Sequence, residues 1–170
     1  MKNQKMTTKR YIIIFLLFTA IIIASNLLAR NTNVCNFSLF ETTNLFTYFG
    51  VLIGFALTIY TFGISMVDSI KQKVDNHTVL NNQQKTEIYE RLVNGFGQIK
   101  GDIWFIFYSI ILVIIFSVLK EIVNPFGWNV ENLKIPETAN LTLFVTSTIA
   151  MCDIMQTLFN LSEINFELNR

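Results

Sequence analysis

The sequence predicts an all-α integral membrane protein, with four transmembrane helices and a cytoplasmic helical hairpin between the second and the third. Two observations lead to this prediction. Of the 170 residues, 52% are hydrophobic and only 15% are charged, whereas charged residues approach about a quarter of an ordinary soluble domain. The apolar residues also gather in four long stretches, each close to the roughly 20 residues that a helix needs to cross the hydrocarbon core of a bilayer. We therefore expect one four-span membrane domain covering residues 1–170.

The first span is predicted at residues 11–28, YIIIFLLFTAIIIASNLL, which contain no charge. A basic N-terminus before an apolar stretch is also typical of a signal peptide. Leu27 and Ala29, however, form a poor small-x-small cleavage site. The pattern favours an uncleaved membrane anchor.

The second span is predicted at residues 45–67, inside the uncharged run between Glu41 and Asp68. At 100° per residue, one face of this helix carries small side chains. They include Gly50, Gly54, Thr58 and Thr61. Small residues let helix backbones approach closely in lipid, and Gly50-x-x-x-Gly54 has the spacing of a known dimerisation motif. The face indicates either packing within one subunit or contact between subunits of a homo-oligomer.

The connection at residues 68–102 is too long for a simple loop. Apolar residues recur in it at helical spacing, so each flanking helix is expected to continue out of the bilayer and form one arm of the hairpin. Asn81 or Asn82 is predicted to cap the returning arm. Three glycines interrupt that arm and predict a hinge: Gly95, Gly97 and Gly101. The hairpin serves either as a spacer or as a docking and sensing element.

The third span is predicted at residues 103–120, directly after Asp102 and ending at Lys120, and the fourth at residues 139–161. A polar stripe follows one face of the fourth helix. It consists of Thr142, Thr146, Asp153, Thr157 and Asn160. A carboxyl group at membrane depth is costly and suggests function. Asp153 is either hydrogen-bonded to a polar side chain of a neighbouring helix, exposed to a water-filled path, or part of a proton or ion relay.

The basic residues predict the orientation. Ten of the 13 lysines and arginines fall before the first span, between the second and third spans, or at the C-terminus. The excess of basic residues on the cytoplasmic side of membrane proteins then predicts a multi-pass protein of the cell membrane with both termini in the cytoplasm.

No motif predicts an enzyme, a metal site or a cofactor. The sequence has no nucleotide-binding loop, no zinc-binding pair and a single histidine, His77. Proteolysis by paired aspartates is not expected, because Asp153 is the only acidic residue inside a predicted span. No basic run is dense enough to predict nucleic-acid binding.

The remaining hypotheses concern membrane proteins without catalytic activity. The first is an oligomeric, channel-like or membrane-perturbing protein, gated by a cytoplasmic signal through its hairpin, as an effector or accessory of a bacterial antiviral defence system. The second is a non-conducting anchor or regulatory subunit that binds a soluble cytoplasmic partner. A small transporter is the third, although the internal repeats and broken helices typical of that class are not visible.

Overall fold

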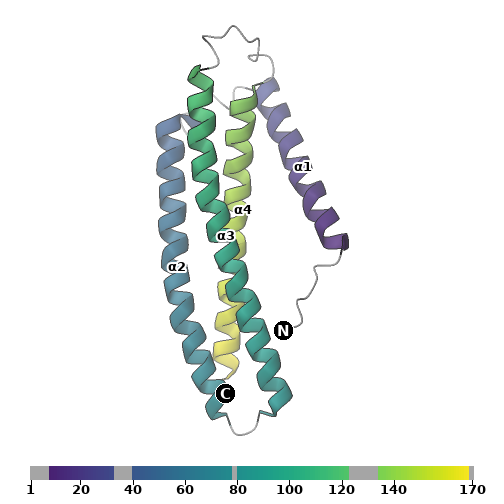
Figure 1. Cartoon of the computed structure of the whole chain (residues 1–170), viewed down its shortest axis with the longest axis vertical. Helices are drawn as coiled ribbons and strands as arrows, with labels where there is room; N and C mark the ends of the chain where they lie inside the picture. Colours follow the sequence, from purple (N-terminus) through teal and green to yellow (C-terminus); the bar gives the residue numbers. More distant parts are fainter. Residues whose placement is uncertain (1–7, 33–39, 78–79, 123–133, 169–170) are drawn as a thin grey trace. The chain divides into compact units, whose positions relative to one another are not determined.

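The computed structural model describes residues 8–32, 40–77, 80–122 and 134–168. They form four helices: α1 (Thr8–Asn31), α2 (Thr42–Asn76), α3 (Asn82–Ile122) and α4 (Ile135–Glu167), as Figure 1 shows. Each helix contains a window that is long and apolar enough to cross a membrane. The prediction of an all-α protein with four candidate membrane spans is confirmed.

Three of the helices are longer than a bilayer requires. α2 has 35 residues, α3 has 41 and α4 has 33. At a rise of about 1.5 Å per residue they measure roughly 50–60 Å, against a hydrocarbon core of about 30 Å. Part of each of these helices must therefore extend beyond the core of any membrane that it crosses.

Local sequence features set where two of these helices begin. Asn81 Oδ1 accepts a hydrogen bond of 2.8 Å from the backbone N–H of Gln84, and Gln84 Oε1 accepts one of 3.0 Å from the backbone N–H of Asn81. This reciprocal pair is a capping box, so the predicted cap at Asn81 is confirmed. α4 follows Lys134, whose φ of 43° turns the chain, and Pro136 stands in the first helical turn, where its missing N–H has no helical partner to lose.

The chain divides into two compact units, and the first combines Met1–Leu45 with Ile111–Thr146. In it, Asn26 Nδ2 donates a hydrogen bond of 3.2 Å to Thr138 Oγ1. Lys134 Nζ donates one of 2.8 Å to the backbone carbonyl of Ala29. That carbonyl lies in the last turn of α1, where helix carbonyls lack partners within the helix. The end of α1 is thus joined to the start of α4, whereas most of the apolar side chains of α1 remain exposed.

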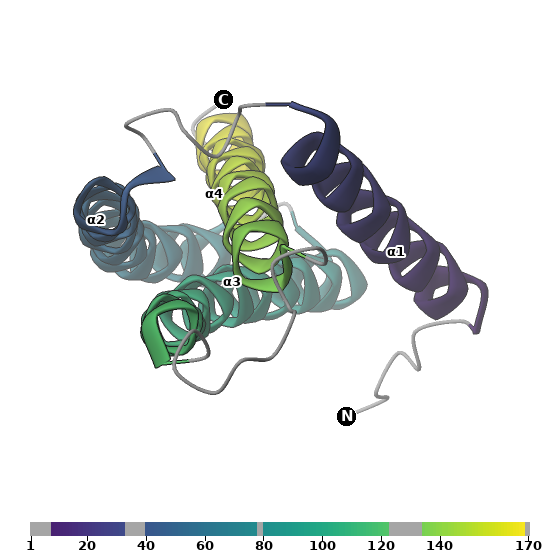
Figure 2. The same cartoon turned by 90° about the horizontal axis from the view of Figure 1, so that it is seen from above.

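The second unit combines Phe46–Ile110 with Ser147–Arg170 and contains parts of α2, α3 and α4. In Figures 1 and 2 these parts run side by side, and buried apolar side chains from all three form one core. The core includes Ile59, Met66, Ile70, Val74, Leu92, Ile99, Ile106, Ile154 and Leu161. Tyr60 of α2 stacks on Phe96 of α3 with ring centroids 4.8 Å apart. The second unit is therefore a packed bundle of three helices.

Candidate functional site

Asp153 of α4 contacts polar side chains of α3. Gln98 Nε2 donates a hydrogen bond of 2.6 Å to Asp153 Oδ2. Asp153 is half-buried in the second unit. Of the three interpretations of this residue, the contact corresponds to hydrogen bonding with a neighbouring helix, with a glutamine as the donor.

A second carboxyl group lies beside Asp153. Burial raises the pKa of Asp102, on α3, to about 7, and the negative charge of Asp153 and a hydrogen bond between the two side chains contribute to the rise. Two ionised carboxylates offer only acceptors, so this bond requires that one of the two groups keeps its proton. Asp102 Oδ2 is buried without a hydrogen-bond partner among the described residues. The two side chains form a carboxyl pair at the contact between α3 and α4.

Sequence reasoning missed this pair, because it treated Asp102 only as the charged residue that precedes the third span. Gln98 and Asp102 are four residues apart, so both side chains lie on one face of α3. This spacing is a signal that could have been read from the sequence. Which residue of α4 meets that face depends on how the two helices pack.

The other residues of the predicted polar stripe lie in different surroundings. Thr142 and Thr146, in the first unit, are buried and donate to carbonyls of their own helix, at 2.7 Å to Thr138 and at 2.8 Å to Thr142. Thr157, in the second unit, is buried, and Asn160 is exposed. The structure thus gives the threonine hydroxyls at 142 and 146 partners within their own helix.

The small residues of α2 lie on an open surface of the second unit. A Cβ atom added to Gly50 or Gly54 would meet no atom within 4 Å, outside the helix's own backbone. Thr58 and Thr61 are exposed, and their hydroxyls donate to the carbonyls of Gly54 and Leu57 at 2.9 and 3.0 Å. The described part of the unit leaves room for another helix at this surface.

The three glycines of the predicted hinge occupy one uninterrupted helix. α3 continues through all of them, and only Gly95 approaches another helix. A Cβ atom there would lie 3.4 Å from Thr157 Cγ2 and 3.5 Å from Leu161 Cδ2. At Gly97 and Gly101 it would meet nothing within 4 Å. Gly95 therefore allows close packing against α4, and a hinge motion stays a prediction.

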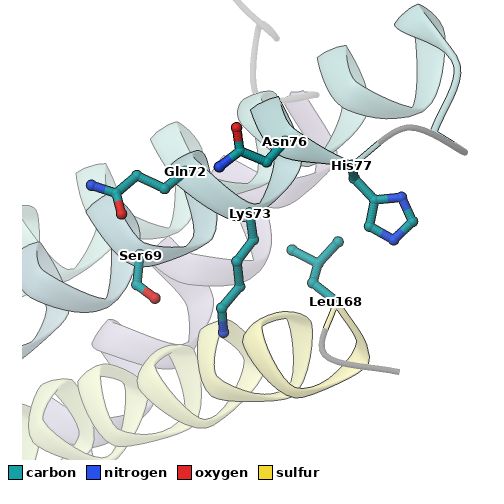
Figure 3. A pocket seen from close by; sticks show the side chains of 6 residues that line it. All are labelled: Ser69, Gln72, Lys73, Asn76, His77 and Leu168. Atoms are coloured by element: carbon teal, nitrogen blue, oxygen red, sulfur yellow. The ribbon is translucent and has the colours of Figure 1, made fainter.

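A shallow hollow of about 350 Å³ lies where the end of α2 meets the end of α4 (Figure 3). It is lined by Ser69, Gln72, Lys73, Asn76, His77 and Leu168. Lys73 points from α2 toward α4, and its Nζ donates a hydrogen bond of 2.6 Å to Asn165 Oδ1. This bond joins the two helix ends. Because the ammonium group of Lys73 is engaged in this bond, we interpret the hollow as part of a structural contact between α2 and α4.

The structure brings Gln98, Asp102 and Asp153 together, and this group is the candidate functional site. Within the described residues, no three His, Cys, Asp or Glu side chains are grouped so that they could hold a metal ion. The chemistry available at the group is hydrogen bonding and proton exchange between carboxyls. Comparison with known proteins gave no match to this chain among family models, curated proteins or solved structures.

Proposed function

We propose that the protein is an oligomeric, channel-like protein of the cell membrane that responds to a signal received by its cytoplasmic helices. One observation supports this most directly: α2, α3 and α4 extend far beyond the length of a span and share a packed core in the second unit. A signal at the extended ends would reach the membrane through these continuous helices.

The charges of α3 indicate where that helix leaves the bilayer. Residues 103–119 carry no charge, whereas the part of α3 that precedes them contains Lys85, Glu87, Glu90, Arg91, Lys100 and Asp102. Charged side chains are costly at membrane depth. We therefore place the inner boundary of the membrane on α3 near Asp102, with the beginning of the helix in the cytoplasm.

Because α3 packs against α4 and α2, its contacts indicate which residues of those two helices lie at the same membrane boundary. Asp153 lies beside Gln98 and Asp102, and Thr157 lies beside Gly95. Residues of α4 after Asp153 are thus level with the charged part of α3. The membrane span of α4 becomes residues 135–152, about 27 Å at 1.5 Å per residue, in place of residues 139–161.

The same argument applies to α2. Tyr60 and Gly63 both contact Phe96, which precedes Asp102 by more than one helical turn. α2 would then leave the bilayer before Tyr60, and its span becomes residues 42–58 in place of residues 45–67. The cytoplasmic extension becomes a bundle of three helices, with the end of α4 packed against the proposed α2–α3 hairpin.

Self-association supports the oligomeric part of the proposal. The open surface around Gly50 and Gly54 falls inside the span proposed for α2. In lipid, a second helix can pack closely against such a surface. We propose that α2 contacts another copy of the chain there.

Ion flux is the decisive test of a channel-like function. Purified protein reconstituted in liposomes is expected to dissipate an imposed ion gradient, and liposomes that contain the Gly54→Leu variant are expected to do so more slowly. The matched control is Phe55→Leu, which changes the neighbouring exposed residue. If the wild-type protein never dissipates the gradient at any lipid composition, the channel-like function is wrong.

One observation favours the alternative of a non-conducting anchor or regulatory subunit. Thr142, Thr146 and Asp153 all have hydrogen-bond partners within the subunit, so the polar stripe does not need a water-filled path. An anchor would leave the gradient intact while the three-helix extension retains a soluble partner. Co-purification of such a partner together with absent flux would select this alternative.

A further inference from the structure

In the described parts of α2, α3 and α4, no lysine or arginine lies opposite the carboxyl pair to compensate its charge. α2 has no charged residue between Glu41 and Asp68, and α4 has only Asp153 between Glu137 and Glu163. On α3 the nearest cation is Lys100, which is exposed and two residues before Asp102, hence about 200° around the helix. Among the described parts of these three helices, the polar neighbour of the pair is the amide of Gln98.

We propose that Asp102 keeps its proton and donates it in a hydrogen bond to Asp153, so that the two side chains form a proton-dependent latch that joins α3 to α4 where the helices leave the bilayer. With the proton present, Asp102 donates a hydrogen bond to Asp153, and Gln98 donates to Asp153 as well. Without it, two adjacent negative charges repel each other. No covalent bond changes, and the proton leaves to water at the cytoplasmic side.

The latch is placed so that its opening would affect helix packing. Gly95, which lies close to Thr157 and Leu161 of α4, is about two turns from Asp102 on α3, and Thr157 is about one turn from Asp153 on α4. Repulsion between Asp102 and Asp153 would loosen this contact first, because Gly95 supplies no side chain of its own to hold α4. The cytoplasmic pH would thus control how firmly the end of α4 is packed against α3.

The direction of the pH dependence follows from proton binding. The folded protein holds the proton of Asp102 up to a pH of about 7, whereas this carboxyl in the unfolded chain releases its proton at the lower pH usual for an aspartate. Stability is therefore highest on the acidic side and falls as pH rises through the range in which the pair loses its proton.

Two measurements on the purified full-length protein in detergent test the latch. Infrared titration from mildly acidic to mildly alkaline pH is expected to show a protonated carboxyl band that disappears as pH rises. Asp102→Asn should remove this band, whereas Asp153→Asn should keep it and shift its disappearance to lower pH, because burial is the larger cause of the raised pKa of Asp102. The melting temperature of the wild type should fall over the same pH range, whereas that of Asp102→Asn should lose this dependence, since an amide donates to Asp153 without a titrating proton.

The control is Asp68→Asn, which removes an exposed acidic residue of α2 and should retain both the band and the pH-dependent melting. The latch is overturned if the wild type shows no protonated carboxyl in this range, or if Asp102→Asn melts with unchanged pH dependence. The wild-type titration decides the matter even if a variant fails to fold. Neither measurement uses ion flux, so the latch and the channel-like function can fail separately.

Discussion

The side-chain amide of Gln98 on α3 donates a hydrogen bond of 2.6 Å to the carboxyl of Asp153 on α4. Removing this donor in Gln98→Ala is expected to destabilise the protein by about 1 kcal/mol, which is less than the roughly 1.5–3 kcal/mol of hydrogen bonds to charged groups, because Gln98 is exposed. Gln98→Glu adds a third carboxyl and should destabilise more at neutral than at acidic pH. Melting temperatures in detergent at both pH values measure this. Gln83→Ala, also on α3, is the control, and equal effects at positions 83 and 98 would contradict the prediction.

Gly95 is the position where α3 approaches α4 most closely among the glycines of that helix. Gly95→Leu should overpack the contact with Thr157 and Leu161 and destabilise the protein by about 1–3 kcal/mol. Gly97→Leu meets open space and should be neutral or slightly stabilising, because glycine weakens a helix interior by up to about 1 kcal/mol. Thermal unfolding in detergent compares the two. If both variants melt alike, Gly95 does not pack as described.

The proposed membrane boundary on α2 can be tested by labelling. Phe62 is 58% exposed and lies beyond the proposed span, so Phe62→Cys should react with a membrane-impermeant thiol reagent added from the cytoplasmic side. Val51→Cys should be protected by lipid, and Val93→Cys on α3 should react as a positive control. The background would have Cys35 and Cys152 replaced by serine. Protection at position 62 would restore the span at residues 45–67.

The open surface of α2 predicts that larger side chains at its glycines weaken self-association. Gly50→Leu and Gly54→Leu should each weaken self-association in detergent while leaving the helical circular dichroism unchanged, since a Cβ at either position would meet no atom of the described residues within 4 Å outside its own helix backbone. Sedimentation at several protein-to-detergent ratios gives the oligomeric state. An unchanged distribution in both variants would place the subunit contact elsewhere.

The capping box predicts a modest loss of stability at the start of α3. Asn81→Ala removes the acceptor for the backbone N–H of Gln84, and such losses cost about 1 kcal/mol. Asn81→Asp preserves an acceptor and should keep most of the stability. The melting temperatures of the two variants provide the measurement, and equal losses would show that the cap contributes nothing.

The apolar runs and their flanking charges determined the four helices, and the asparagines before α3 indicated its cap. This was possible because helix formation in an apolar solvent depends on local composition: backbone groups must find partners within the segment. The small face of α2 and the position of Asp153 in a predicted span are also local patterns, so the sequence indicated both. In each case the deciding pattern lies within a single helix.

Only the tertiary structure decided which residues of different helices meet. The sequence placed Asp102 just before one span and Asp153 inside another, and nothing in either segment sets them side by side. That contact depends on the register of α3 against α4, which the approach at Gly95 and the shared core fix together. Register is a property of two surfaces that pack, so the carboxyl pair became visible only when both helices were in place.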